Sequence, residues 1–370
     1  MNLFQIKRTL EPIVQLTTKS KSLLFCFLIV MATTQIKAQN TGRIIPKSYV
    51  ANYISDSLKI DGIADETVWK NAPWTDEFID IEGVKKPKYQ TKVKMLWDDK
   101  YFYFYAELEE PHIWGDITKR DAVIFYNNDF EIFMDPDGDS HNYMEFEMNA
   151  LNTIWDLFLT KPYRNGNRIL DNWDINGMKT AVSIDGTLND PSDIDTKWSV
   201  EIALPWSVLL EGSSSTSIPK NDYWRVNFSR VNWDFDIKEG VYDRKKDSKT
   251  NKFLPEYNWV WSPQGVINMH EPEKWGYVFF AADNKNAKKF KLTNDELIRL
   301  ELYNVHKKQR NYFGKHKKWN LDLFKPSIKI KGEKVNLTTE TTQYSYVISA
   351  KSPFTNKTLL INDEGKLTTY

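Results

Sequence analysis

The chain has 370 residues and a balanced charge, with 50 lysines and arginines against 50 aspartates and glutamates. A formal net charge of zero gives no electrostatic reason to expect a nucleic acid or an anionic membrane surface as a partner. Aromatic residues make up 14% of the chain, including 14 tryptophans. This abundance is typical of all-β cores and also of proteins that stack sugars on aromatic rings.

Residues 1–38 have the features of a secretory signal peptide. Basic residues precede the apolar run Leu23–Met31, which is too short to span a bilayer, and Ala38 provides a small residue before the cleavage point. An uncleaved anchor is the alternative. The only cysteine, Cys26, lies in the apolar run, so the mature chain has no disulfide and depends on its core for stability. We expect a bacterial protein that is secreted or held in the periplasm or cell envelope.

Residues 45–282 alternate short apolar-periodic runs with turn signals. A polar lead-in, Asn40–Tyr53, comes first, and Lys238–Lys252 is a charged loop without apolar periodicity. Pro205 opens a short helix over Trp206–Leu210. Outside residues 127–162, strands are expected at Thr91–Trp97, Tyr101–Leu108, Lys179–Ile184, Lys197–Leu204, Trp224–Val231 and Trp275–Phe280. Many short strands without a long helix predict an all-β fold, a β-sandwich of the immunoglobulin or jelly-roll kind.

The stretch 127–162 is the centre of this pattern. Residues 130–134 and 144–149 alternate apolar and polar side chains, so that Phe130 and Phe146 share one face while Glu131 and Glu147 share the other. Alternation of this kind predicts one face on the core and one face free for water or a ligand.

The turn between these two strands carries three carboxylates around a glycine. Asp135, Asp137 and Asp139 supply hard oxygen ligands, and Gly138 permits a sharp turn. These residues predict a structural calcium site. They also suit a plain Asp-Gly hairpin turn.

The composition changes after Ala282, and residues 283–370 form a second region. Thr293 and Glu296 have the spacing of a capping box. The apolar residues that follow have helical spacing: Ile298, Leu302, Val305 and Tyr312. The helix is expected to end near Gly314. The remaining residues alternate around two turns and predict a small β-meander, which we interpret as a packing appendage of the sandwich.

Several motifs, taken together, resemble the family 9 carbohydrate-binding modules. They are LKIDGIADETVW (58–69), TKVKMLWDDKYFYFYAELEEP (91–111), NDFEIFMDPDGDSHNYMEFEMNA (128–150), WSVEIALPW (198–206), WRVNFSR (224–230) and EKWGYVFF (273–280). The resemblance covers about residues 53–281. It implies a β-sandwich with structural calcium that stacks a terminal sugar between two tryptophans.

The chain departs from this family at the positions that bind the sugar. Phe125 stands near the position of one clamp tryptophan, and Met269 stands near that of the other. Glu147 replaces an arginine that is frequent in the family. The resemblance therefore implies the fold more directly than the ligand.

The polar strand face and nearby aromatic residues define the predicted carbohydrate site. Sugars need polar partners for their hydroxyls and a ring for their apolar C–H face. Three tryptophans that adjoin Asp, Asn or Gly are assigned to loops or rims. The predicted residues are Phe125, Glu147, Asn149, Trp155, Trp173, Arg225, Asn227, Ser229, Trp233, Met269 and His270. We predict a secreted, non-catalytic protein that binds an oligo- or polysaccharide during glycan degradation.

Three alternatives remain at this point. A glycoside hydrolase or lyase would use Glu131, Glu145 and Glu147, since glycosidases place two carboxylates across the scissile bond. A haem-binding sandwich would use histidine and methionine ligands, for which the sequence offers His112, His141, Met144 and Met148. The third alternative is a structural envelope protein.

Overall fold

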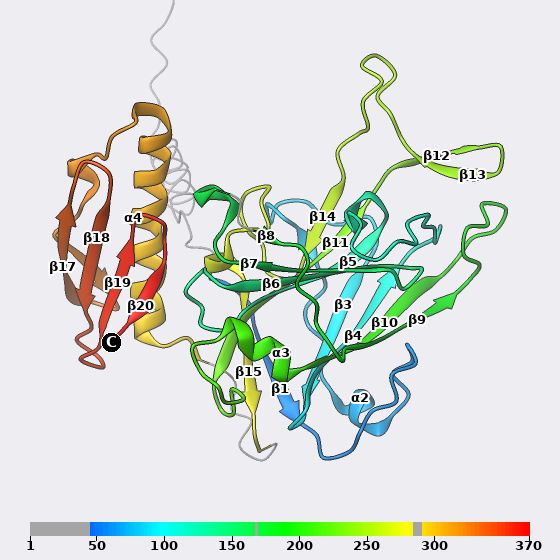
Figure 1. Cartoon of the computed structure of the whole chain (residues 1–370), viewed down its shortest axis with the longest axis horizontal. Coiled ribbons are helices and arrows are strands. Elements are labelled where there is room, and N and C mark those ends of the chain that lie inside the picture. The colour runs from blue at the N-terminus through cyan, green and yellow to red at the C-terminus, as the bar shows by residue number, and fades with distance from the viewer. Residues whose placement is uncertain (1–44, 167–168, 284–290) are drawn as a thin grey trace, which may run out of the picture. The chain divides into compact units, whose positions relative to one another are not determined.

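The computed structural model describes residues 45–166, 169–283 and 291–370, so the predicted signal peptide lies outside the described residues. Most of the strands in the described residues belong to one 13-stranded sheet (Figure 1). Its strands pair in the order β8 (Ile169–Leu170), β7 (Ile154–Leu159), β6 (Tyr143–Asn149), β5 (Asp129–Asp135), β11 (Tyr223–Asn232), β15 (Gly276–Ala281), β1 (Ser48–Tyr53), β3 (Thr91–Trp97), β4 (Tyr101–Glu109), β10 (Lys197–Pro205) and β9 (Lys179–Asp185). β14 (Tyr257–Val260) also pairs with β11, and β2 (Ile79–Asp80) pairs with β14.

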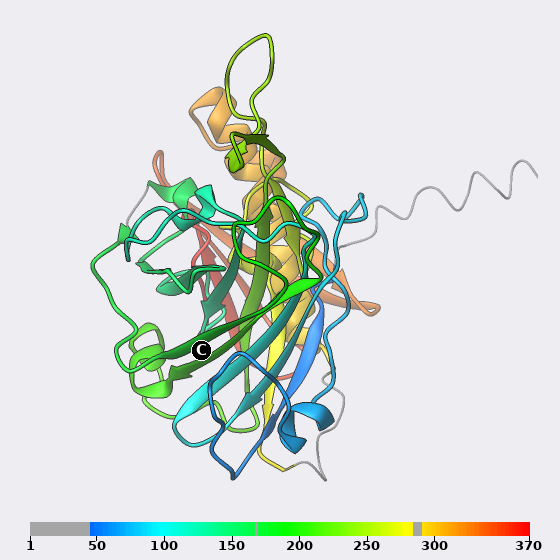
Figure 2. The ribbon, with the colours of Figure 1, turned by 90° about the vertical axis from the view of Figure 1, so that its right-hand side faces the viewer.

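Strand β1 joins the two halves of this sheet. It runs parallel to β15 on one side and to β3 on the other, whereas the remaining pairs are antiparallel. The sequence prediction of a polar lead-in is wrong here, because Tyr49 and Ala51 are buried in the core and the Tyr49 hydroxyl donates to the Pro73 carbonyl at 2.6 Å. The sheet is strongly curled (Figure 2). The predicted β-sandwich is confirmed, and its two layers are the two halves of one continuous curled sheet.

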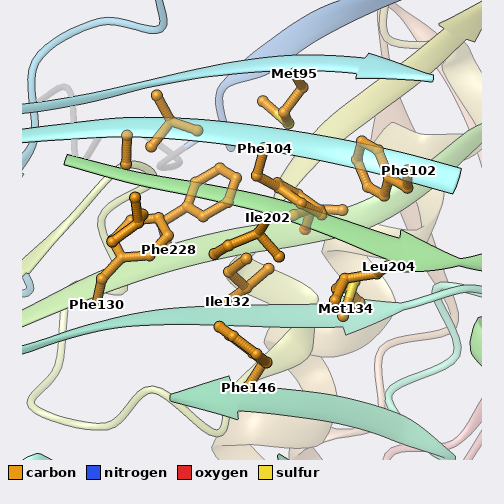
Figure 3. Close-up of a cluster of buried hydrophobic side chains, with 14 of the residues drawn as sticks. Met95, Phe102, Phe104, Phe130, Ile132, Met134, Phe146, Ile202, Leu204 and Phe228 are labelled. Carbon is orange, nitrogen blue, oxygen red and sulfur yellow. The ribbon is translucent and has the colours of Figure 1, made fainter. Parts of the chain in front are cut away.

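The hydrophobic core lies between these halves. Strands β3, β4 and β10 contribute Met95, Phe102, Phe104, Ile202 and Leu204, and the opposite half contributes Phe130, Ile132, Met134, Phe146 and Phe228 (Figure 3). All ten side chains are fully buried. The period-2 alternation therefore predicts correctly which face of each strand packs on the core.

The opposite face of β5 and β6 differs from its prediction. All seven residues of each strand are buried, so this face is not freely open to water. A second apolar cluster covers part of it, formed by Ile81, Phe133, Tyr143, Leu157, Leu159, Val260, Met269 and Trp275. We refer to this side as the outer face of β5 and β6.

The sandwich contains only short helices. The predicted helix after Pro205 is confirmed as α3 (Trp206–Leu209), and α2 (Thr67–Asn71) carries the buried Trp69. Four 3₁₀ turns are η2 (Ile124–Tyr126), η3 (Tyr163–Asn165), η4 (Leu210–Gly212) and η5 (Pro272–Lys274). The predicted loop 238–252 overlaps a hairpin, β12 (Phe235–Lys238) with β13 (Val241–Arg244).

The C-terminal segment has its own core. Helix α4 (Asn294–His316) packs on a five-stranded meander (Figure 1), with η6 (Leu321–Leu323) between them. The predicted N-cap is confirmed, because Thr293 accepts a hydrogen bond from the Glu296 amide at 3.2 Å. The helix ends two residues later than predicted, at His316. The strands are β16 (Ser327–Ile330), β17 (Glu333–Thr341), β18 (Tyr346–Lys351), β19 (Thr358–Asn362) and β20 (Leu367–Thr369).

Polar contacts join the C-terminal segment to the sandwich. Glu296 accepts hydrogen bonds from the hydroxyls of Tyr223 and Tyr277, at 2.7 and 2.9 Å. Arg299 donates to the carbonyl of Gly138 in the acidic turn. Residues 45–370 form one compact unit, and the predicted domain boundary near residue 282 stays a prediction. In the described part of the chain, no helix combines the length and apolar character needed to cross a membrane.

Candidate functional site

Three glutamates share the outer face of β5 and β6. Glu131 on β5 lies opposite Glu147 on β6, and Glu145 follows two residues from Glu147 on the same face. Their exposed fractions are only 5%, 2% and 4%. Strand parity alone therefore gathers three carboxylates on a buried patch of sheet.

These glutamates form the floor of a cavity of about 230 Å³, which we call the acidic pocket. Five of the predicted carbohydrate-binding residues line it, namely Phe125, Glu147, Trp155, Met269 and His270. The remaining lining residues are Ile81, Glu131, Phe133, Glu145, Leu157, Tyr163, Val231, Glu256, Asn258, Ile267 and Asn268. The hydrolase candidates and part of the predicted binding site thus belong to the same pocket.

Two aromatic residues form part of the pocket wall. Trp155 lies in β7, directly opposite Glu147, and is half-buried, so its predicted loop position is wrong. Its indole Nε1 is buried and has no hydrogen-bond partner among the described residues. Phe125 lies in η2, and its backbone amide donates to Glu147 Oε2 at 3.1 Å.

His270 lies beside the glutamates as a neutral group. Its Nδ1 pairs with the Tyr143 hydroxyl at 2.9 Å, and its Nε2 is 3.9 Å from Glu145 Oε2. Burial lowers the pKa of His270 to about 3. The ring of Tyr163 packs on His270, with ring centroids 3.9 Å apart. His270 therefore brings no positive charge to Glu145 at neutral pH.

Burial and mutual repulsion shift the pocket carboxyls in one direction. Burial raises the pKa of Glu131 to about 7. Burial, and then the neighbouring acidic residues, raise the pKa values of Asp129, Glu145 and Glu147 well above their ordinary range. An oxygen of Glu145 and one of Asp129 have no hydrogen-bond partner among the described residues. The pocket thus holds acidic groups that are buried, close together and short of donors.

Three predicted residues on β11 lie outside the pocket. Arg225 is 2% exposed and donates to the backbone oxygens of Glu273 and Trp275, at 3.0 and 3.1 Å. Asn227 exchanges two hydrogen bonds with the backbone of Ser262. Ser229 is fully buried opposite Glu131 in the strand pairing but does not line the cavity.

Three further predicted residues also lie outside the pocket. Asn149 is fully buried and holds the turn after β6, where its side chain accepts from the amides of Leu151 and Thr153. Trp173 packs on Phe158 and donates to Glu211 at 2.7 Å. The third residue, Trp233, is 6% exposed and donates to the Phe125 carbonyl at 2.8 Å, so it supports a pocket residue from outside.

The predicted calcium turn does not bring its three carboxylates together. Asp135 is fully buried and accepts hydrogen bonds from the amides of Gly138 and Ser140. Asp137 accepts instead from Ser214, and Asp139 from the amide of His141. The described residues contain two other acidic groups whose oxygens lie within 4.8 Å of one another and that could hold a metal: Asp121, Asp156 and Asp174, and Asp129, Glu131 and Glu147.

The structure gives the haem candidates packing roles. Met144 and Met148 are fully buried in the core between the sheet halves. His112 Nδ1 lies 3.0 Å from the Tyr242 hydroxyl, and its ring packs against Phe235. His141 is buried in the turn after Asp139. The two methionines therefore face the core, away from the pocket.

Several pocket residues carried no signal in the sequence. Tyr163 lies in a 3₁₀ turn, Glu256 precedes β14, and Ile267 and Asn268 lie in the loop before η5. None of them belongs to an alternating run. Glu131 and Glu145 carried a signal, since strand parity places them beside Glu147, but they were predicted only as residues of the alternative glycoside hydrolase or lyase.

Comparisons with known proteins identify a single family. The model of the family described as carbohydrate family 9 binding domain-like matches residues 60–278. No curated protein matches the chain. Among solved structures, one crystal structure of a putative carbohydrate-binding protein from Bacteroides uniformis ATCC 8492 aligns with a TM-score of 0.48 at 14% identity, covering 64% of this chain and 100% of that chain.

Two further solved structures belong to a family 9 carbohydrate-binding module from Caldicellulosiruptor kristjanssonii. Its complex with cellotriose aligns with a TM-score of 0.42 at 16% identity, over 67% of this chain and 100% of that chain. Its complex with glucose aligns with a TM-score of 0.41 at 17% identity, over 65% of this chain and 98% of that chain.

Proposed function

Since the chain belongs to the carbohydrate family 9 binding domain-like family, we propose that it is a non-catalytic carbohydrate-binding protein whose ligand enters the acidic pocket. The observation that carries this proposal is the combination of polar and aromatic groups in one cavity. Carboxylates accept hydrogen bonds from sugar hydroxyls, and Trp155 and Phe125 offer rings to the C–H face of a sugar. The volume of about 230 Å³ is below the usual range of pockets for drug-sized ligands, which suits one end of a saccharide chain.

The placement of the glutamates supports binding over glycosidic hydrolysis. Glycosidases place their two carboxylates on either side of the scissile bond. Glu131, Glu145 and Glu147 all project from one face of the same sheet, so a saccharide resting on that face meets all three from one side. We therefore assign them to ligand recognition.

The test compares two half-buried tryptophans, one inside the pocket and one outside it. Native protein is first screened for retention on polysaccharides, and the products are assayed for new reducing ends. Calorimetry on a retained glycan then compares Trp155→Ala with Trp173→Ala. Loss of a stacking ring costs about 1–3 kcal/mol by analogy with bases on aromatic residues, or roughly tenfold to a hundredfold in affinity.

We expect Trp155→Ala to lose affinity by this amount and Trp173→Ala to bind as the native protein does. Equal binding by both folded variants would place the site elsewhere. New reducing ends that depend on Glu131, Glu145 or Glu147 would favour the glycoside hydrolase or lyase instead.

We also propose that the protein is exported and acts in a glycan-degrading system. Residues 1–38 support export, because a basic segment and a short apolar run precede Ala38. Mass spectrometry of the protein recovered from outside the cytoplasm provides the check. A mature form that still carries Leu23–Met31 would contradict cleavage.

A structural calcium ion is the final part of the proposal. Asp121, Asp156 and Asp174 support it better than the Asp135 turn does, because their oxygens converge within 4.8 Å. Arg120 lies 2.5 Å from Asp156 and 2.8 Å from Asp174, so one positive charge faces three carboxylates. Calcium prefers oxygen ligands of this kind.

A further inference from the structure

The lining of the acidic pocket has a large imbalance of charge. Glu131, Glu145, Glu147 and Glu256 line it, and no lysine or arginine does so among the described residues. Asp129 adds a fifth carboxyl, with an oxygen within 4.8 Å of oxygens of Glu131 and Glu147. Neutral hydroxyls do not require such an excess of negative charge.

The chain supplies partners to buried glutamates elsewhere. Glu110 is 2% exposed, and it accepts hydrogen bonds from Arg230 and Asn232, both at 2.8 Å. Glu201 is fully buried and accepts from the Trp69 indole at 2.8 Å and the Asp61 amide at 2.9 Å. A glutamate that serves only to stabilise this fold is therefore surrounded by donors.

Glu145 lacks such partners. It is 4% exposed and lines the cavity, and its Oε2 has no hydrogen-bond partner in the described part of the chain. The nearest basic atom is His270 Nε2 at 3.9 Å, on a neutral ring. A buried carboxylate oxygen without a donor requires an external one, and a charged donor gives the stronger hydrogen bond.

The aromatic wall favours a ligand that has both a ring and a positive charge. Cations are attracted to the faces of tryptophan and tyrosine rings, and Trp155 and Tyr163 line the same cavity as the glutamates. A bare metal ion would use the carboxylates alone. The cavity of about 230 Å³ also has far more room than one ion fills.

We propose that the ligand is a saccharide with a protonated primary amine, that is, an amino sugar whose nitrogen is not acetylated, and that its ammonium group enters the acidic pocket and donates to Glu145. This inference rests on the proposed function, because it names the class of saccharide. An ammonium group has three N–H donors and no acceptor, so it can supply the charged donor that Glu145 Oε2 lacks. A uronate or sulfated saccharide is repelled by the same charges.

The experiment is calorimetry on the native protein with four matched trimers. They are the β-1,4-linked trimer of glucosamine, the same trimer fully N-acetylated, the corresponding trimer of glucose, and a trimer of a uronic acid. Each titration is made at a pH at which the amine is protonated, with and without a chelator. The variants are Glu145→Gln and, as a control that removes one exposed negative charge, Glu340→Gln.

We expect the glucosamine trimer to bind at least tenfold more tightly than the acetylated and glucose trimers, and the uronic acid trimer not to bind. Glu145→Gln should lower the affinity for the glucosamine trimer about tenfold and leave binding of the glucose trimer nearly unchanged. Glu340→Gln should behave as the native protein does. Chelator should have no effect on these affinities.

Four results would overturn the inference. If the neutral trimers bind as tightly as the glucosamine trimer, the amine preference is wrong and the carbohydrate-binding function stands. If no saccharide of any class binds, both proposals fail. If Glu145→Gln and Glu340→Gln bind the amine equally well, the amine binds outside the pocket. If calcium chloride alone binds and Glu145→Gln abolishes its binding while the amine trimer does not bind, the pocket holds a metal ion.

Discussion

Two buried polar regions of the molecule partner their charged groups in opposite ways. In the acidic pocket, carboxylates face one another and a neutral histidine. At the contact with the C-terminal segment, which we call the paired junction, acids and bases alternate. Arg164 donates to Glu273 at 2.9 Å, and Glu296 accepts from two tyrosines and lies 3.4 Å from Arg299.

The difference separates structural polar groups from functional ones. Removing a charge from water is costly, and a fold that buries one for stability must surround it with partners. The paired junction meets this requirement and holds the C-terminal segment on the sandwich. The acidic pocket does not meet it, so its carboxylates are placed to receive partners from a ligand.

The first prediction compares one glutamate from each region, because Glu296 and Glu145 are both 4% exposed. Glu296→Gln removes the negative charge beside Arg299, which has a side-chain exposure of 11%. Breaking a buried ion pair costs about 3–5 kcal/mol, so we expect a loss of this size in the free energy of unfolding. Glu145→Gln should be neutral or stabilising, because the buried carboxyl oxygen that it replaces has no hydrogen-bond partner to lose.

Urea unfolding followed by tryptophan fluorescence measures both values. An equal loss in the two variants would mean that the acidic pocket has partners that stabilise its charges in the native protein. The contrast between the two regions would then be wrong.

The sequence predicts the outer face of β5 and β6 correctly and its environment incorrectly. Alternation along β5 and β6 places Glu131, Glu145 and Glu147 together, and the register confirms that Glu131 lies opposite Glu147. What buries these residues comes from distant segments. Met269 and Trp275, which follow β11 in the sequence, cover this face. No local sequence pattern predicts such a contact.

The tryptophans show the same limit. Trp155, Trp173 and Trp233 are each followed directly by aspartate, so their local sequences are alike. One lines the pocket, one packs on Phe158, and one supports Phe125. Tertiary packing decides among these positions, which is why local sequence predicted the β-sandwich far better than the members of the site.

The second prediction uses pH, since the two regions titrate with opposite signs. The pKa of Glu131 is about 7 in the folded chain, above its ordinary value of 4.5. Between these values the folded state binds more protons than the unfolded state, so the free energy of unfolding falls as the pH rises through about 7. Glu131→Gln removes this dependence and should be more stable than the native protein above that pH, by about 1–3 kcal/mol.

At the paired junction, the free energy of unfolding depends on pH in the opposite direction, through His306 on α4 beside Arg164. His306 is 1% exposed, and burial together with Arg164 and Arg310 lowers its pKa well below 6.5. The unfolded state then binds more protons, so stability falls as the pH drops below about 6.5. Urea unfolding over a pH series should show that Glu131→Gln removes the loss of stability between pH 4.5 and about 7 and leaves the contribution of His306 unchanged. A constant difference between variant and native protein at every pH would contradict the assignment.

The third and smallest effect concerns calcium at Asp121, Asp156 and Asp174. This group is intermediate between the acidic pocket and the paired junction, because one arginine, Arg120, faces three acidic residues. Calcium that binds only the folded state at ten times its Kd stabilises by about 1.4 kcal/mol. Chelation should lower the Tm by a few degrees in native protein shown beforehand to contain calcium.

Asp174→Asn should abolish this shift. Asp137→Asn in the Asp135 turn should keep it, because Asp137 already accepts a hydrogen bond from Ser214. The reverse result would return the ion to the turn that the sequence predicts, and an unchanged Tm after chelation would rule out a structural role for calcium.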